Sequence, residues 1–157
     1  MSDGDVAVRL ARPGDERLIQ AAAAGVFDHV PRADLTTEFL RDPRHHLAVA
    51  IADGRIVGFV SAVHYVHPDK SAELWINEVA VAPTHQNRRV GRSMLDEMLA
   101  HGRRLRCRCA WVLTSHANAA AMRLYATAGG VPEREPSVLF EFDLDPADSK
   151  ADDRELT

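Results

Sequence analysis

Residues 72–99 join an apolar run to an amphipathic helix pattern through a short polar and basic turn. In the run, AELWINEVAV, the apolar side chains lie at even positions up to Ile76 and at odd positions from Val79. A β-strand alternates its two faces, so this change of phase at Asn77-Glu78 predicts either a strand buried on both faces or a β-bulge. A bulge would leave backbone groups unpaired beside the Glu78 carboxylate, and an extended ligand could bind there by strand-like hydrogen bonds.

The turn that follows, QNRRVGR at residues 86–92, leads directly into the helix pattern. Successive backbone N–H groups at a helix N-terminus point outward and carry partial positive charge, which suits a pyrophosphate group. The three arginines of the turn would add long-range attraction. A solvated basic loop is the alternative interpretation, because a single glycine is weak evidence for a phosphate cradle.

The rest of the chain alternates strand and helix patterns. Asp53-Gly54 between two apolar runs is typical of a type I′ hairpin turn, and Gly102 is expected to end the helix that follows the basic turn. The pattern predicts strands at 6–10, 47–52, 55–65, 72–81, 110–114 (buried) and 137–144, and helices from residue 15 to about 25 and at 34–40, 90–100 and 118–128.

Composition limits the number of domains and the kinds of partner. The 157 residues, 46% of them hydrophobic, predict a single domain at 1–144, and the acidic segment 145–157 is expected to be a disordered tail. The net charge of −4 gives no basic excess for nucleic acid. No apolar stretch suits a membrane span or a signal peptide, so we expect a cytoplasmic protein. Cys107 and Cys109 lack the second pair that a zinc site needs, so no metal is expected.

Two motifs in order resemble those of a known family. The pattern V-x-P-x-x-Gln86-x-x-Arg89-x-Gly91 resembles motif A of the GCN5-related N-acetyltransferases (GNAT), with Arg89 where the family has its first glycine. The run NxxAxxLY from Asn118 to Tyr125, followed by a glycine pair, is similar to motif B. The resemblance covers nearly the whole chain. It implies the GNAT fold, an α/β (α+β) domain with a mixed, mostly antiparallel sheet of six to seven strands, about four helices and a bulged strand.

The resemblance also implies acetyl transfer from acetyl-CoA to a primary amine in a ternary complex. By position, the backbone of the bulged strand would pair with the pantetheine arm, and the amides of the basic turn would hold the pyrophosphate. The implied cofactor-binding residues are Val79, Ala80, Val81, Gln86, Asn87, Arg88, Arg89, Val90, Gly91, Arg92 and Asn118. Arg89 is expected at an ordinary negative φ, with its side chain directed outward.

Two side chains are the candidates for acid–base catalysis. Glu78 would accept the proton of the amine, directly or through water, and Tyr125 would donate a proton to the departing thiolate. A backbone N–H near the bulge would stabilise the developing oxyanion. Each has a structural alternative, because Tyr125 could belong to the core and Glu78 could be an edge carboxylate with a structural partner.

A looser similarity to the gentamicin-type aminoglycoside 3-N-acetyltransferases concerns the acceptor. It rests on Glu78 before Val79-Ala80-Val81, on the Phe27-Asp28 loop and on the ending FEFDLDP. It implies a small polycationic substrate and a role in antibiotic resistance. Carboxylates that could bind such a substrate are Asp28, Glu73 and Asp143. Another polyamine, a protein or peptide amine, and a non-catalytic acyl-CoA-binding protein remain as alternatives, and so do a monomer and a homodimer.

Overall fold

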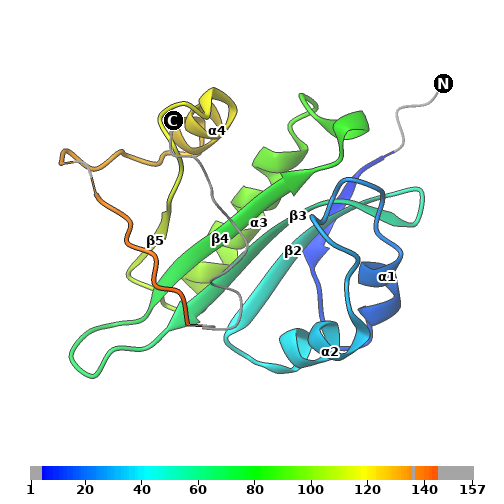
Figure 1. Ribbon diagram of the computed structural model, residues 1–157, viewed down its shortest axis with the longest axis horizontal. Coiled ribbons are helices and arrows are strands. Elements are labelled where there is room, and N and C mark those ends of the chain that lie inside the picture. The colour runs from blue at the N-terminus through cyan, green and yellow to red at the C-terminus, as the bar shows by residue number, and fades with distance from the viewer. Residues whose placement is uncertain (1–4, 136, 145–157) are drawn as a thin grey trace.

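The computed structural model describes residues 5–135 and 137–144, in which one five-stranded sheet has helices on both faces (Figure 1). The strand order is β1-β2-β3-β4-β5, and all neighbours are antiparallel except β4 and β5, which are parallel. The strands are β1 (Ala7–Leu10), β2 (His45–Ala52), β3 (Arg55–Tyr65), β4 (Glu73–Val81) and β5 (Cys109–Val112). The predicted mixed, mostly antiparallel α/β fold is therefore confirmed, with five strands in place of six to seven.

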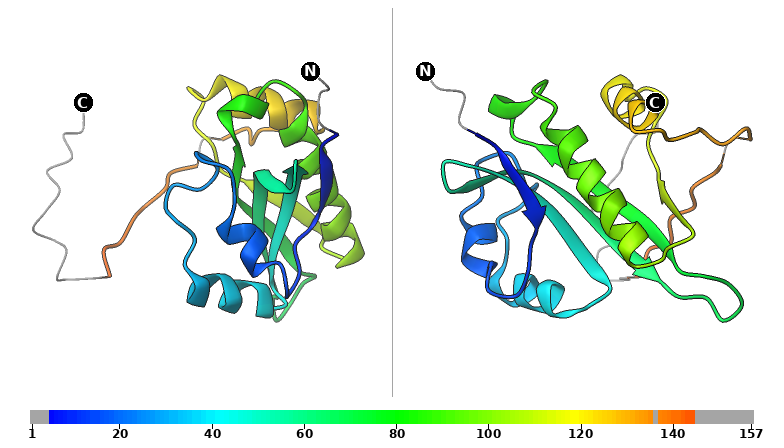
Figure 2. Two further views of the ribbon diagram at one scale, coloured as in Figure 1. Left: turned by 90° about the vertical axis from the view of Figure 1, so that its right-hand side faces the viewer. Right: turned by 180° about the vertical axis from the view of Figure 1, so that it is seen from behind.

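Figure 2 shows the helices in two layers, because α1 and α2 lie on one face of the sheet and α3 crosses the other. The helices are α1 (Glu16–Gln20), α2 (Ala33–Arg41), α3 (Val90–Arg104) and α4 (Ala119–Thr127), and a short 3₁₀ helix, η1, covers Pro83–His85. The face of the sheet under α3 is called the back face, and the face under α1 and α2 the front face. Within the described residues, no helix is both long enough and apolar enough to cross a membrane.

The core lies mainly between α3 and the back face of the sheet. Met94 and Met98 of α3 are fully buried there. Gly58 of β3 is needed for this packing, since a Cβ at that position would lie 2.9 Å from the Met94 Cε. On the front face, Phe59 stacks on Phe27 with ring centroids 4.4 Å apart, which fixes the loop that follows α1.

Three predicted element boundaries were wrong for identifiable reasons. Helix α1 ends at Gln20 and not near residue 25, because the Ala23 N–H donates to the carbonyl of Ile56 in β3. Helix α3 continues past Gly102 to Arg104, because this glycine allows close packing on β4 and does not end the helix. Strand β5, predicted at 110–114 and buried, covers 109–112 and is partly exposed, since within residues 5–135 and 137–144 it has a strand neighbour on one side only.

Two further predictions concern a turn and the C-terminal segment. Asp53 and Gly54 have φ values of 49° and 73°, as the predicted type I′ hairpin requires. The predicted strand at 137–144 is not in the sheet, and its large apolar side chains are exposed. The predicted tail, 145–157, lies outside the described residues.

A chain of three histidines connects α3 to the back face of the sheet. The ring of His46 in β2 is buried, its Nε2 lies 2.8 Å from Nδ1 of His64, and its Nδ1 lies 2.9 Å from Nε2 of His101. Burial, with the nearby charges of His101 and His64 as lesser causes, lowers the pKa of His46 to about 4. His46 is therefore neutral at pH 7 in the folded protein.

This buried histidine predicts a loss of stability in mild acid. The folded-state pKa of His46 lies below the unfolded value of 6.5, so the unfolded chain binds the proton first as the pH falls. The free energy of unfolding therefore keeps its full value above about pH 6.5 and falls by roughly 3 kcal/mol in total as the pH decreases toward 4. We expect urea denaturation of His46→Leu to show a flatter pH dependence than wild type in this window. The matched control, His29→Gln at an exposed histidine, should follow wild type, and parallel curves for all three proteins would contradict the prediction.

Candidate active site

Strand β4 carries a bulge at the position where the apolar pattern changes phase. Ser61 of β3 pairs with Glu78, but the next residue, Ala62, pairs with Ile76, so that Asn77 is an extra residue without a partner on β3. The predicted bulge is therefore confirmed. Because paired residues share a face, Glu78 points with Ser61 toward the front face of the sheet.

Strand β5 leaves β4 at the same place. The parallel pairing of the two strands ends at Ile76 and Val112, immediately before the bulge. Figure 1 shows that β4 continues upward while the chain after β5 turns away toward α4. In the described residues, 78–81 of β4 therefore pair with β3 on one side and with no strand on the other. An unpaired edge of this kind can hydrogen-bond an extended ligand as a further strand would.

The basic turn after β4 has two residues in the left-handed region. Asn87 has a φ of 60° and Arg89, the N-cap residue of α3, has a φ of 62°. The expected negative φ of Arg89 is therefore wrong. The position needs the conformation that a glycine would adopt most easily, and arginine adopts it with strain. A left-handed residue next to right-handed ones directs successive N–H groups into one concavity, which is a site for an anion.

Two side chains of the turn, those of Gln86 and Arg92, have hydrogen-bond partners within the protein. Arg92 pairs with Asp96 through Nε at 2.8 Å and donates to the carbonyl of Thr127, so its guanidinium ties α3 to the end of α4. Gln86 donates to the carbonyl of Val81 at 3.2 Å, which closes the turn against β4. The backbone amides at the start of α3 are therefore the part of this turn best placed for a phosphate group.

Helix α4 brings Tyr125 toward the start of α3. Asn118 caps α4, accepting a hydrogen bond from the Ala121 N–H at 3.0 Å. A Cβ at Gly91 of α3 would lie 3.7 Å from Leu124 of α4, so the two helices are in contact. Tyr125 is half-buried, its hydroxyl has no hydrogen-bond partner in the part of the chain that the structure describes, and burial raises its pKa. The hydroxyl therefore stays protonated at neutral pH and can donate.

Glu78 is the carboxylate beside the bulge, and a second carboxylate lies near it. Desolvation against the sheet raises the pKa of Glu78, and the negative charge of Asp28 raises it further. Asp28 follows Phe27, whose stacking on Phe59 holds the loop on the front face. The structure thus brings two of the predicted site residues together, and a raised pKa makes Glu78 a stronger base near neutral pH.

Glu73 and Asp143 are not part of this pair. Glu73 is buried and accepts hydrogen bonds from the Tyr65 hydroxyl at 2.8 Å and from Arg108 Nε at 3.0 Å. The Tyr65 hydrogen bond is the main cause of its lowered pKa, and Lys70 and Arg108 add to it. Asp143 lies in the segment outside the sheet.

A pair of tryptophans on the same face was not predicted as a pair. Trp75 of β4 and Trp111 of β5 stack with ring centroids 5.1 Å apart and planes within 8°. They are direct register partners, and Trp111 Nε1 donates to the Tyr65 hydroxyl at 3.0 Å. Only the strand register could have shown this pair, because the two residues lie far apart in the sequence. No group of three or more metal-binding side chains is found among residues 5–135 and 137–144.

Comparisons with known proteins agree with this geometry. A model of the acetyltransferase (GNAT) family matches residues 16–129. No curated protein matches the chain in a sequence comparison. One solved structure with a similar fold is the aminoglycoside acetyltransferase meta-AAC0020 from an uncultured soil metagenomic sample, at 16% identity and a TM-score of 0.75, covering 89% of this chain and 97% of that one.

Two other similar structures carry different names. The aminoglycoside N-acetyltransferase AAC(6')-Iy in complex with CoA is 20% identical with a TM-score of 0.70, covering 90% of this chain and 96% of that one. A ribosomal-protein-alanine N-acetyltransferase from Brucella melitensis biovar Abortus 2308 is 16% identical with a TM-score of 0.69, covering 88% of this chain and 100% of that one. At these identities the likeness shows the fold alone.

The left-handed conformation of Arg89 predicts that Arg89→Gly stabilises the protein. This conformation costs a non-glycine residue roughly 1–2 kcal/mol. The greater backbone entropy of glycine in the unfolded chain offsets roughly 0.5–1 kcal/mol of that gain. We therefore expect a net gain of up to about 1 kcal/mol in urea denaturation at neutral pH. Arg89→Ala is the matched control, because it removes the guanidinium and keeps the Cβ, and it should give no gain. An equal gain in both variants would assign the effect to charge.

Proposed function

The chain belongs to the acetyltransferase (GNAT) family and is an acetyl-CoA-dependent N-acetyltransferase, and we propose that it acetylates a primary amine of a small polycationic molecule. An aminoglycoside acetylated at N-3 is the acceptor that we favour. The observation that carries the proposal is the bulge in β4. It places Glu78, with Asp28 near it, beside a strand edge that has no strand partner in the described residues.

The residues present fit coenzyme A at two places. The unpaired edge of β4 at residues 79–81 suits the amide groups of the pantetheine arm, which would extend along it like a strand. The amides of residues 86–92, ordered by the left-handed Asn87 and Arg89 and by the start of α3, suit the pyrophosphate. When bound, acetyl-CoA supplies the acetyl group as a thioester.

In the proposed reaction three protein groups act in turn. Glu78 takes a proton from the acceptor ammonium, so that the neutral amine can form the new C–N bond. A backbone N–H at the bulge donates to the carbonyl oxygen as negative charge develops there. As the C–S bond breaks, the Tyr125 hydroxyl gives its proton to the departing thiolate, directly in the ternary complex and without an acyl-enzyme.

The carboxylate pair supports a polycationic acceptor. Burial raises the pKa of Glu78, and repulsion from Asp28 raises it further. An acceptor with more than one positive charge would offset this repulsion and bind more strongly beside the two carboxylates. The two similar structures that are aminoglycoside acetyltransferases agree with a polycationic acceptor. The ribosomal-protein-alanine N-acetyltransferase from Brucella has a similar TM-score to this chain. A protein or peptide amine is therefore the second candidate acceptor.

The alternative of a non-catalytic acyl-CoA-binding protein is less well supported. This alternative requires that arginine at position 89 prevents the backbone amides of residues 86–92 from binding a phosphate group. Arg89 keeps a positive φ, so the turn has the backbone conformation that a glycine would give it. Tyr125 also retains a protonated hydroxyl without a protein partner in the described residues, which a binding protein would not need.

A thiol-release assay with acetyl-CoA and a panel of amines tests the proposed function. Gentamicin-like aminoglycosides should give the highest kcat/KM, above spermidine and above peptides with a free N-terminus. Tyr125→Phe should lower kcat by about 100-fold with little change in the KM for acetyl-CoA, if the hydroxyl acts in the transition state. Turnover of peptides alone would move the acceptor to the second candidate, and no turnover with CoA still bound would favour the non-catalytic alternative.

The Glu78–Asp28 pair predicts a specific change in the pH–rate profile. A base must be deprotonated to act, so kcat/KM should fall on the acidic side as the pH passes below the pKa of Glu78. Asp28→Asn removes the charge that helps to raise this pKa, and the acidic limb should move to lower pH. Glu78→Gln should remove the limb and most of the activity. Glu38→Gln, at an exposed carboxylate on α2, is the control and should leave the limb unchanged; an unshifted limb in Asp28→Asn would contradict the pairing.

A further inference from the structure

Two tryptophans on the front face of the sheet lie next to the carboxylate of the bulge. Glu78 pairs with Ser61 of β3. Trp75 pairs with Val63, further along β3 on the same face, so the positions of Trp75 and Glu78 are roughly 7 Å apart. Trp111 of β5 is the register partner of Trp75 and stacks on it. The indole pair therefore borders the place where the acceptor amine would meet Glu78.

The indole pair is fixed by its own contacts. Trp111 Nε1 donates to the Tyr65 hydroxyl at 3.0 Å, and that hydroxyl donates to Glu73 at 2.8 Å. These hydrogen bonds orient Trp111, and Trp111 supports one face of Trp75 with ring centroids 5.1 Å apart and an angle of 8° between the planes. A surface that is ordered in advance binds a ligand at a lower cost in entropy.

Trp75 presents its indole to solvent beside the site. Its exposed fraction is 37%. Because Trp111 stacks from the side of β5, the opposite face of the Trp75 ring is turned toward β3. Small-molecule sites combine apolar and aromatic walls with a few polar groups that fix the orientation of the ligand. At this place the indole is the wall and Glu78 is the polar group.

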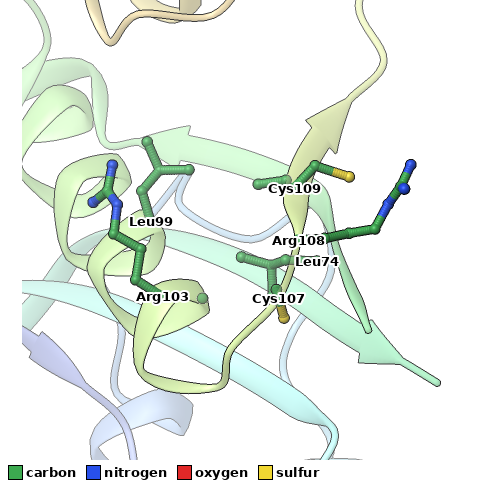
Figure 3. Close-up of a pocket in the computed structure, with 8 residues that line it drawn as sticks. Leu74, Leu99, Arg103, Cys107, Arg108 and Cys109 are labelled. Carbon is green, nitrogen blue, oxygen red and sulfur yellow. The ribbon is translucent and has the colours of Figure 1, made fainter. Parts of the chain in front are cut away.

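The far end of the indole pair does not favour a second ammonium group. Glu73 lies there, but Arg108 Nε donates to its Oε1 at 3.0 Å, and Lys70 Nζ lies 3.6 Å from the same oxygen. Figure 3 shows Arg108 extending from β5 away from α3. With two cations around this carboxylate, a further positive charge would be repelled as much as attracted. An uncharged, apolar surface is therefore the better match for the space over the tryptophans.

We propose that Trp75 determines acceptor specificity by stacking on a saturated ring that carries the reacting amine, as in amino sugars and aminocyclitols. This inference rests on the proposed acetylation of a polycationic amine. The amines of such a ring project from its edge, where they can meet Glu78, and its faces carry C–H groups. These C–H groups are weakly positive and suit the negative face of an indole. A linear polyamine has no such face and loses more conformational freedom when it binds.

Tryptophan fluorescence tests the contact directly, because the two tryptophans of the chain are Trp75 and Trp111. The full-length protein with CoA is titrated with neamine, a two-ring aminoglycoside, and with spermine, a linear amine with the same number of amino groups. Neamine should change the emission saturably, and spermine should bind about 10-fold more weakly. An emission unchanged by neamine, or equal affinities for the two amines, would overturn the inference. The titration of wild type requires no turnover and no variant.

Variants show whether the indole recognises a ring or a charge. Trp75→Leu should raise the KM for neamine about 10-fold and leave the KM values for spermine and acetyl-CoA unchanged. Trp75→Phe keeps an aromatic face and should retain most of the neamine affinity. Val66→Ala is the matched control, since Val66 follows β3, is 73% exposed and contacts neither tryptophan in stacking nor in register, and it should match wild type. Melting curves confirm that each variant is folded.

The outcomes separate this inference from the proposed function. Turnover of neamine with unchanged emission, an unchanged neamine KM in Trp75→Leu, or equal losses for neamine and spermine in that variant would each overturn the role of Trp75 and leave the acetyltransferase activity intact. If no amine is turned over, the proposed acceptor class fails, and the titration alone decides. A saturable neamine signal that weakens about 10-fold in Trp75→Leu, read from Trp111, supports the ring contact, and its absence refutes it.

Discussion

One extra residue in β4 determines how the site is built. Asn77 has no partner on β3, so the register changes between Ile76 and Glu78. Before the bulge the even-numbered residues of β4 lie on the back face, and after it the odd-numbered residues do. The change directs Glu78 to the front face, where Asp28 lies, and keeps Val79 and Val81 toward α3. The pairing with β5 stops at the same point. At a single backbone irregularity, a carboxylate is thus turned to the front face next to a strand edge that is unpaired in the described residues, and a regular strand would turn Glu78 to the back face.

The environment, and not the residue type, distinguishes the two glutamates of β4. Glu73 and Glu78 are both on the front face, but Glu73 accepts a hydrogen bond from Tyr65 and pairs with Arg108, which lower its pKa. Glu78 has desolvation and the charge of Asp28, which raise its pKa. A carboxylate held ionised by fixed partners suits a structural role. One whose charge is disfavoured can exchange a proton during a reaction.

The features that the sequence predicted well are those encoded by local periodicity. The phase change in AELWINEVAV indicated the bulge, and Asp53-Gly54 indicated the hairpin, because in both cases neighbouring residues determine the geometry. The misplaced features depend on contacts between distant residues. Gly102 looked like a helix end and is a packing position against Leu74. Arg89 takes a left-handed conformation that arginine itself disfavours, so the tertiary structure at the start of α3 must impose it.

The divergence of β4 and β5 also explains why the C-terminal edge of the sheet is exposed. A strand that leaves its neighbour after four paired residues gains few hydrogen bonds, and β5 has no second neighbour in the described residues. It is also the strand that leads into α4 and therefore positions Tyr125. The separation that leaves residues 78–81 of β4 without a second strand neighbour in the described residues therefore also directs the chain into α4, whose Leu124 lies against Gly91 at the start of α3.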